Sequence, residues 1–272
     1  MQEKIVVLDI DGTLTNSKKQ ITDATKQSLW TIMRQGHKVI LASGRPTPGM
    51  RRYEKELELS NYGGYLLSFN GGRIVDCRTG KVVYQRVLPA GTHVELYQFA
   101  KENGCGLITY QKNVILSAFE PDEYVQLEAR INGLEVKVLE NFVEAIDFDL
   151  NKCLLTAPPE KAEIFEQQLK EKYQDSLSVY RSEPFFIEVM PQNVDKAASL
   201  DHMLKNLGWN RKNTICCGDG FNDLSMIRYG NVGVAMGNAQ SVVKEAADYV
   251  TGTNDEDGLV EVIEKFVMHK AG

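Results

Sequence analysis

The sequence has few of the residues that build disulfide frameworks or zinc sites. Its 272 residues include only five cysteines and four histidines. The cysteines are odd in number and scattered, and the adjacent pair Cys216 and Cys217 is poorly suited to forming a bridge with itself. A zinc site needs Cys or His paired at ligand spacing, and the histidines lie far apart in the sequence. We therefore expect reduced thiols and no structural zinc.

An excess of positive charge and a long apolar run are also missing. The chain has 31 Lys and Arg against 37 Asp and Glu, a formal net charge of -6. Such a balance provides no general attraction to nucleic acid or to anionic lipid. The first apolar stretch, residues 4–8, meets an aspartate at Asp9 and is too short for a signal peptide or a membrane span. We expect a cytoplasmic protein that binds neither nucleic acid nor membranes.

What the sequence does contain is typical of an ordinary globular protein. Hydrophobic residues make up 43% of the chain and charged residues 25%. Its length exceeds that of most single domains, so we expect either one large α/β domain or a core domain with a second, smaller one.

Strands and helices alternate at both ends of the chain. Residues 4–8 are rich in β-branched side chains and predict a buried strand, and Thr22 is suited to capping a helix that runs to about residue 35. Further elements are expected at 38–42 (strand), 195–207 (helix), 214–217 (strand), from about 222 (helix), 232–235 (strand) and 259–267 (helix). This alternation favours a doubly wound parallel sheet with helices on both faces, a Rossmann-like α/β core.

The middle of the chain has a different pattern. We expect strands at 83–88, within 107–119, and at 135–138, 152–156, 178–180 and 185–189, with helices at 92–103, 122–132 and 160–172. Strand pairs joined by short turns such as Lys112-Asn113 favour an antiparallel sheet covered by helices. The prediction is a core of residues 1–82 and 188–272, with residues 83–187 inserted as an α+β cap domain.

Polar residues follow several of the predicted core strands. They are Asp9, Asp11, Gly12 and Thr13, then Ser43, Gly44 and Arg45, then Lys196 at a helix start, and Gly218, Asp219, Asn222 and Asp223. Singly, each group has an ordinary explanation, because Asp and Gly are common in turns and helix caps and a single lysine at a helix start is usually solvated. In a parallel sheet, however, loops that follow the strands converge at one edge, where ligands bind.

Taken together, these residues favour a site for a metal ion and a phosphate group. Four carboxylates at one edge of a sheet (Asp9, Asp11, Asp219 and Asp223) repel one another unless a cation lies among them, and hard oxygen ligands favour Mg2+. A metal ion would keep Asp9 ionised and nucleophilic at neutral pH. Lys196, a hydroxyl of Ser43 or Thr13 and the backbone at Gly12 would then meet the other oxygens of a phosphoryl group.

The order and spacing of these segments resemble the four motifs of the haloacid dehalogenase superfamily. The matching residues are Asp9-x-Asp11-Gly12-Thr13, Ser43-Gly44-Arg45, Lys196 and Gly218-Asp219-x-x-Asn222-Asp223. The chain looks most like the Cof-type sugar-phosphatase branch, in which a large α+β cap lies between the second and third motifs. Asn70-Gly71-Gly72, Glu188-Val189-Met190-Pro191 and Gly233–Ala239 resemble further segments of that branch.

The resemblance implies a role for each residue of the site. Asp9 would attack phosphorus and form an aspartyl-phosphate, and Asp11 would protonate the leaving alcohol and later deprotonate water. Mg2+ would be bound by Asp9, Asp219 and the backbone carbonyl of Asp11. The substrate phosphate would be held by Gly12, Thr13, Ser43, Gly44, Lys196 and Asn222, with Asp223 orienting Lys196. Asn193 and Ala197 depart from the pattern, since glycine is common at both positions around the lysine.

The expected activity is Mg2+-dependent hydrolysis of small phosphomonoesters, either sugar phosphates or phosphorylated cofactors. A phosphomutase of the same superfamily is the alternative enzyme, because transfer to a second hydroxyl needs the same nucleophile. A non-catalytic binding protein on this fold would be expected to lose one of Asp9, Asp11, Lys196 or Asp219, and all four are present. A receiver domain of bacterial signalling would be less than half as long, with its acceptor on a middle strand. The sequence does not distinguish a monomer from a homodimer.

Overall fold

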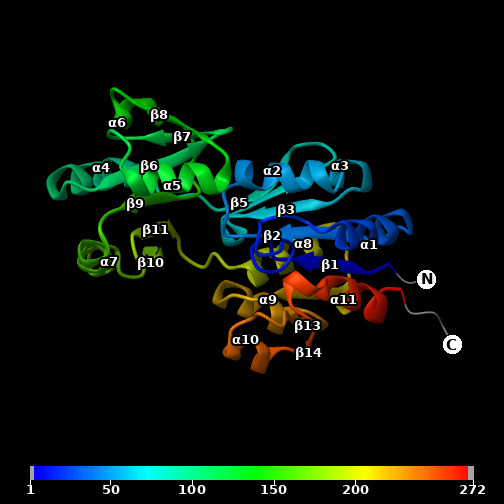
Figure 1. The fold of residues 1–272 in the computed structure, drawn as a ribbon. Helices are drawn as coiled ribbons and strands as arrows, with labels where there is room; N and C mark the ends of the chain where they lie inside the picture. Colours follow the sequence, from blue (N-terminus) through cyan, green and yellow to red (C-terminus); the bar gives the residue numbers. More distant parts are fainter. Residues whose placement is uncertain (1–2, 269–272) are drawn as a thin grey trace. The chain divides into compact units, whose positions relative to one another are not determined.

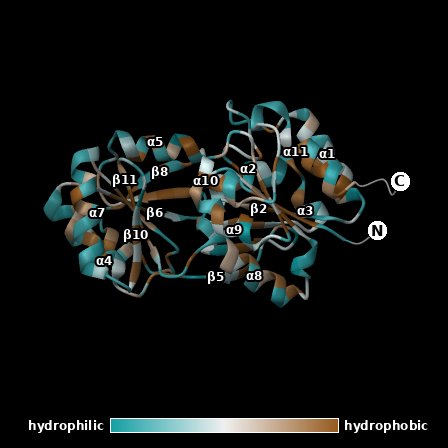
Figure 2. Cartoon of the chain, turned by 90° about the horizontal axis from the view of Figure 1, so that it is seen from below, coloured by the Kyte–Doolittle hydropathy of each residue, from teal (hydrophilic) through white to brown (hydrophobic). Residues whose placement is uncertain are grey.

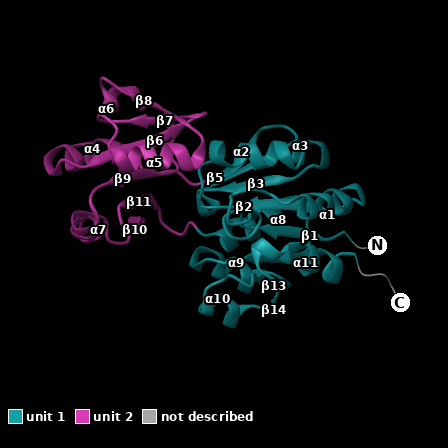
Figure 3. Cartoon of the chain, in the orientation of Figure 1, with its two compact units in different colours: residues 1–84, 195–272 teal, residues 85–194 magenta. Residues whose placement is uncertain are grey.

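The computed structural model describes residues 3–268 and divides them into two compact units (Figure 3). The first unit comprises residues up to Tyr84 and from Asp195 onward, and the second runs from Gln85 to Val194. The predicted insertion, 83–187, ends seven residues before the second unit does, a difference that arises because the strand of residues 186–191 belongs wholly to the second unit.

The first unit is an alternating α/β structure. Its strands are β1 (Ile5–Leu8), β2 (Lys38–Ala42), β3 (Tyr65–Ser68), β4 (Arg73–Asp76), β5 (Val82–Gln85), β12 (Thr214–Gly218), β13 (Val232–Ala235) and β14 (Tyr249–Val250). Its α-helices are α1 (Asp23–Arg34), α2 (Thr47–Glu56), α3 (Leu59–Tyr62), α8 (Lys196–Leu207), α9 (Leu224–Tyr229), α10 (Ser241–Ala246) and α11 (Gly258–Phe266). Short 3-10 helices are η1 (Phe69–Gly71), η2 (Arg211–Asn213), η3 (Phe221–Asp223) and η4 (Asn254–Glu256).

Strand β1 lies in the interior of an eight-stranded sheet (Figure 1). The strand order is β14-β13-β12-β1-β2-β3-β4-β5. The chain moves outward from β1 through β2 and β3, and later returns to the other side of β1 with β12. Both neighbours of β1 are parallel to it, whereas β4 runs antiparallel to β3. The predicted doubly wound, mostly parallel core is therefore confirmed.

Alternate residues of the core strands face two different helical layers. On one face, Val6 and Leu8 lie in a hydrophobic cluster with side chains from α1, α2 and α11. On the other face, Ile5 and Val7 lie in a cluster with side chains from α8 and α9. Both faces of β1 are buried, which explains its uninterrupted apolar sequence. Figure 2 shows both hydrophobic and hydrophilic residues on α1 and α11, as expected of helices that cover a sheet.

The second unit is a six-stranded sheet with helices. Its strands are β6 (Gly106–Gln111), β7 (Val114–Ser117), β8 (Glu135–Val138), β9 (Cys153–Thr156), β10 (Leu177–Glu183) and β11 (Phe186–Pro191), in the order β10-β11-β9-β6-β7-β8. Its helices are α4 (Thr92–Asn103), α5 (Glu123–Asn132), α6 (Phe142–Ala145) and α7 (Pro159–Tyr173). Buried side chains of α4 and α7, among them Leu96 and Leu169, form one core cluster with the sheet residue Leu155.

Two details of the predicted insertion are wrong. The strand expected at 83–88 is β5, which ends at Gln85 and extends the sheet of the first unit as its outermost strand. The sheet of the second unit is not purely antiparallel, because β8 runs parallel to β7. Helix α5 connects these two strands as a crossover, and a crossover returns the chain in its original direction.

Candidate active site

Three neighbouring strands bring the predicted site residues to one edge of the first sheet. Leu8, the last residue of β1, pairs with Cys217 on β12 and with Leu41 on β2. The pairing continues past the strand, since the backbone N–H of Asp9 donates to the carbonyl of Cys217 at 3.0 Å. The segments that follow β1, β2 and β12 therefore leave the sheet side by side, and each of them carries polar residues singled out in the sequence.

Lys196 occupies the centre of this edge. It is the first residue of α8 and its side chain is completely buried. The Nζ atom donates to Oδ1 of Asp9 and to Oδ1 of Asp223, both at 2.6 Å. Burial lowers the pKa of Lys196, but the two carboxylates outweigh this effect and raise the pKa above its usual value. The lysine is thus held as a cation between two acidic groups.

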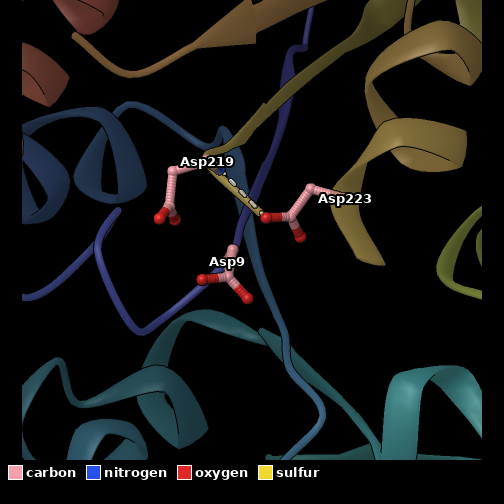
Figure 4. Close-up of side chains that lie close together, drawn as sticks. All are labelled: Asp9, Asp219 and Asp223. Carbon is pink, nitrogen blue, oxygen red and sulfur yellow. Dashed lines mark hydrogen bonds between the residues drawn. The ribbon is translucent and has the colours of Figure 1, made fainter. Parts of the chain in front are cut away.

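The carboxylates of Asp9, Asp219 and Asp223 lie close together (Figure 4). One oxygen from each lies within 4.8 Å of the others. Asp223 is fully engaged, because its Oδ1 accepts from Lys196 and its Oδ2 accepts from the backbone N–H groups of Asp219 (3.0 Å) and Gly220 (2.9 Å). Within residues 3–268, no hydrogen-bond donor contacts Oδ2 of Asp9 or Oδ2 of Asp219.

This donor set fits a divalent cation such as Mg2+. Burial and the charge of Asp223 raise the pKa of Asp9 well above its usual value, although Lys196 opposes them. Burial likewise raises the pKa of Asp219, to about 6, against the hydrogen bond that Thr13 donates. Asp9 is buried and Asp219 is half-buried, and each has a raised pKa and an oxygen to spare, which is an arrangement that a hard cation stabilises. Asp9 and Asp219 are therefore the residues suited to hold the ion.

Two glycines allow the carboxylates to approach the backbone closely. Gly12 has a φ of +86°, and a Cβ placed on it would lie 2.3 Å from Oδ2 of Asp219. A Cβ on Gly218 would lie 2.4 Å from the Cβ of Asp223. Both distances are impossible for real atoms, so any side chain at either position would displace an acidic residue of the site.

Asp11 does not join the cluster of three carboxylates and has cationic partners of its own. Its side chain accepts from Nε of Arg45 at 2.6 Å, from Nη2 of Arg45 at 2.9 Å and from Nζ of Lys19 at 2.9 Å. Burial raises the pKa of Asp11, but these hydrogen bonds and charges outweigh it and bring the pKa to about 2. Because the carboxylate is engaged in this way, the backbone carbonyl is the part of Asp11 that can serve a metal ion.

The predicted phosphate contacts lie around the same edge. Ser43 is buried, and its Oγ accepts from the backbone N–H of Arg45 at 3.2 Å, which leaves its hydroxyl proton available. Asn222 donates to Oδ1 of Asn70 at 3.1 Å, and a Cβ on Gly44 would lie 3.2 Å from that same oxygen. The hydroxyl of Thr13 instead donates to Oδ1 of Asp219 at 2.9 Å. Thr13 therefore orients an acidic residue with its hydroxyl and keeps only its backbone N–H for a phosphate.

Several residues that support the site were not assigned a role from the sequence. Asn238 donates to the carbonyl of Gly12 at 2.8 Å, and its Oδ1 accepts from the backbone of Asn254 at 3.0 Å. Asn254 in turn donates to the carbonyl of Thr15 at 2.8 Å. These asparagines tie the loop after β1 to the loops that follow β13 and β14. The signal for Asn238 was the resemblance of residues 233–239 to a family segment, and Asn254 lies outside that segment.

Comparison with known proteins settles the family. The sequence profile of the haloacid dehalogenase-like hydrolases matches residues 6–263. The chain belongs to this family. The match spans both units and confirms the resemblance seen in the four motifs.

Individual relatives of this hydrolase agree over nearly its whole length. A haloacid dehalogenase-like hydrolase from Bacteroides thetaiotaomicron has a crystal structure that matches with a TM-score of 0.94 and 44% identity, over 97% of this chain and 99% of the other. The subclass IIB sugar phosphatase BT4131 matches with a TM-score of 0.81 and 27% identity, over 97% and 98%. A 5-amino-6-(5-phospho-D-ribitylamino)uracil phosphatase of Bacillus subtilis is 29% identical, over 97% of this chain and 96% of the relative. The chain is thus a Cof-type hydrolase.

Two expectations about the rest of the molecule concern cysteines and membranes. All five cysteines are buried and unbridged, and burial raises the pKa of Cys105 to about 11 and that of Cys153 and Cys216 to about 12. At neutral pH these thiols are protonated and therefore poor nucleophiles.

Within residues 3–268, no helix combines the length and the apolar character that a membrane span requires.

Proposed function

We propose that this hydrolase is a Mg2+-dependent phosphatase that removes phosphate from small phosphomonoesters through an aspartyl-phosphate on Asp9. The observation that carries the proposal is the position of Lys196, buried and 2.6 Å from both Asp9 and Asp223, beside the uncommitted oxygens of Asp9 and Asp219. The relatives named as phosphatases support the same chemistry. Sugar phosphates or phosphorylated cofactors are the proposed substrate class.

In the first step, a carboxylate oxygen of Asp9 attacks phosphorus. A bond between this oxygen and phosphorus forms while the bond from phosphorus to the leaving oxygen breaks, and Asp11, which is ionised in the free protein, relays the proton of the substrate monoanion to that oxygen. In the second step, water attacks the aspartyl-phosphate, Asp11 takes up a proton from the water and passes it to the departing phosphate, and inorganic phosphate leaves. Asp9 and Asp11 are then restored to their starting states.

The surrounding residues stabilise the charge on the phosphoryl oxygens during both steps. Lys196 supplies a fixed positive charge, Asp223 holds its ammonium group in place, and Ser43 offers a hydroxyl donor. Asp9 and Asp219, with the carbonyl of Asp11, would hold Mg2+, which when bound supplies positive charge that keeps both carboxylates ionised. The phosphate is also proposed to receive backbone or side-chain contacts from Gly12, Thr13, Gly44 and Asn222.

The inserted unit is proposed to select the leaving group, and its residues that contact substrate stay unassigned. A cytoplasmic location and a monomeric or homodimeric state likewise remain predictions.

The direct test is release of inorganic phosphate from a panel of phosphomonoesters, with and without Mg2+. We expect Mg2+-dependent release that falls at least about 1,000-fold in Asp9→Asn, because that change removes the nucleophile at nearly constant size. Asp23→Asn is the matched control, since Asp23 is fully exposed on α1. Unaltered release in Asp9→Asn would refute the mechanism, and transfer of phosphate to a second hydroxyl in place of water would indicate a phosphomutase.

Metal binding is tested independently by thermal melting. A ligand that binds only the folded state raises the melting temperature. We expect Mg2+ to raise the melting temperature of the native protein and to have much less effect on Asp219→Asn, which lacks one of the two charged ligands. An equal shift in both proteins would place the ion elsewhere.

A further inference from the structure

The carboxylate of Asp11 is almost fully occupied by two cationic side chains. An ionised carboxylate has about four lone-pair positions, two on each oxygen. Arg45 takes one position on each oxygen, with Nε 2.6 Å from Oδ2 and Nη2 2.9 Å from Oδ1. Lys19 takes the second position on Oδ1 at 2.9 Å. One lone pair, on Oδ2, is left for a further partner.

The two cations differ in how firmly they are held. The side chain of Arg45 is only 7% exposed, whereas that of Lys19 is 56% exposed. The backbone of Arg45 is fixed on both sides, because its N–H donates to Oγ of Ser43 and its carbonyl accepts from the N–H of Phe69 at 2.9 Å. Its guanidinium also lies 5.9 Å from the ring centre of Tyr53. Arg45 is therefore a rigid support, and Lys19 is a flexible side chain at the surface.

A two-bond fork between arginine and a carboxylate fixes the plane of the carboxylate as well as its position. A single ammonium group cannot do this, because it bonds as a point charge that rotates freely. The orientation of Asp11 in the site thus depends on Arg45, which follows β2, rather than on the loop after β1 that carries Asp11 itself.

We propose that Arg45 is a positioning residue that orients Asp11 so that Oδ2 serves the leaving-group oxygen. This inference rests on the proposed function, in which Asp11 exchanges protons with that oxygen. Arg45 does not touch the reacting atoms and acts through Asp11. Its contribution is therefore largest for substrates whose leaving group needs a proton.

The experiment compares two esters in Arg45→Lys, which keeps the charge and removes the fork. For p-nitrophenyl phosphate the leaving group departs as a stable anion, whereas glycerol phosphate must release an alkoxide or receive a proton. The parameter is kcat/KM, which reports the steps up to the first irreversible one and so isolates transfer to Asp9. We expect a fall of at least about 10-fold for glycerol phosphate and less than about 3-fold for p-nitrophenyl phosphate. Arg52→Lys, an exposed change on α2, is the matched control.

A double-mutant cycle with Asp11→Asn shows whether Arg45 acts through Asp11. Residues that work as a unit have non-additive effects, so Arg45→Lys should add little to the loss in Asp11→Asn. Equal losses for both esters, or fully additive losses in the double variant, would overturn the proposal. Lys19→Met should change the ratio of the kcat/KM values for the two esters less than Arg45→Lys does.

A crystal structure of Arg45→Lys provides a readout that needs no activity. We expect the carboxylate of Asp11 to rotate or to adopt more than one orientation, while Lys196, Asp9 and Asp223 keep their places. An unchanged Asp11 would refute the positioning role even if the protein hydrolysed none of the esters. If the native protein hydrolysed none of the esters, the proposed phosphatase function would be refuted. The crystal structure of Arg45→Lys tests the positioning role separately from that function.

Discussion

At the scale of single residues, the fold keeps some buried groups charged and others neutral. Lys196 is completely buried yet remains a cation, because two carboxylates lie 2.6 Å from its Nζ. His37 is also buried, but among the described residues no carboxylate hydrogen-bonds to it, and its Nδ1 accepts a hydrogen bond from the backbone N–H of Lys4 at 2.9 Å. An acceptor nitrogen has no proton, so His37 is held neutral.

His37 should make the protein sensitive to mild acid. Burial lowers the pKa of His37 below its usual value. As the pH falls, the unfolded chain therefore takes up the proton first, so the stabilising effect is full above about pH 6.5 and is lost as the pH falls below it. We expect His37→Asn, whose Oδ1 can accept the same hydrogen bond, to lose less stability than the native protein between pH 7 and pH 5. Urea melts across this range measure the difference, and a constant difference at every pH would contradict the prediction.

At the scale of elements, helix α8 delivers the central lysine. Asp195 caps the helix, since its Oδ1 accepts from the backbone N–H of Ala198 at 2.8 Å, and Lys196 is the next residue. A further contact from Oγ of Ser225 at 3.3 Å connects the cap to α9. The side chain of Asp195 thus defines the start of α8, and the next residue, Lys196, carries the ammonium group of the site.

Removal of this cap should affect both stability and catalysis. We expect Asp195→Ala to destabilise the protein by about 1 kcal/mol, because an N-terminal N–H of the helix loses its partner. We also expect kcat to fall, because fraying of the first turn moves Lys196. Asp195→Asn retains an acceptor and should restore most of both properties, as measured by urea melts and steady-state kinetics. If Asp195→Ala were as active and stable as Asp195→Asn, the cap would have no part in positioning Lys196.

The shorter elements between β2 and β5 were harder to anticipate. Helix α2 begins Thr47-Pro48 without a side-chain hydrogen bond at its cap, so it has no ordinary start signal other than proline. The strands β3 and β4 are four residues each, too short to show a clear period. Only their place in the sheet, where β3 pairs with β2 and β4 pairs with β3, makes them strands.

At the scale of the whole molecule, each unit has a hydrophobic core of its own. The clusters around Leu66 in the first unit and Leu155 in the second share no residues. Both leucines are completely buried. Separate cores allow each unit to lose its structure locally without requiring the other to unfold.

We therefore expect Leu155→Ala to loosen the second unit selectively. Truncation of a buried leucine typically costs about 2–5 kcal/mol. Hydrogen exchange should accelerate in β6, β9 and α7 while β1 and β2 keep their protection. Leu66→Ala is the matched variant in the first unit and should give the reverse pattern. If either substitution accelerated exchange throughout the chain, the two units would fold as one cooperative body.

The sequence by itself determined the elements with strong local signals and the segments that carry the chemistry. Side-chain type and spacing were sufficient to predict the strand before Asp9, the capping role of Thr22 and the bounds of β2. These features depend on residues that are neighbours along the chain. The motif residues Asp9, Lys196, Asp219 and Asp223 were found because their order and approximate spacing in the chain matched a known pattern.

Only the tertiary structure decided which atoms meet. The fork from Arg45 to Asp11 joins residues 34 positions apart, and the hydrogen bond from Thr13 to Asp219 joins residues 206 positions apart. The position of β5 was also decided by tertiary structure. This strand pairs with the open edge of the first sheet at β4. Such contacts depend on the packing of the whole chain, and a local pattern of residues contains no information about them.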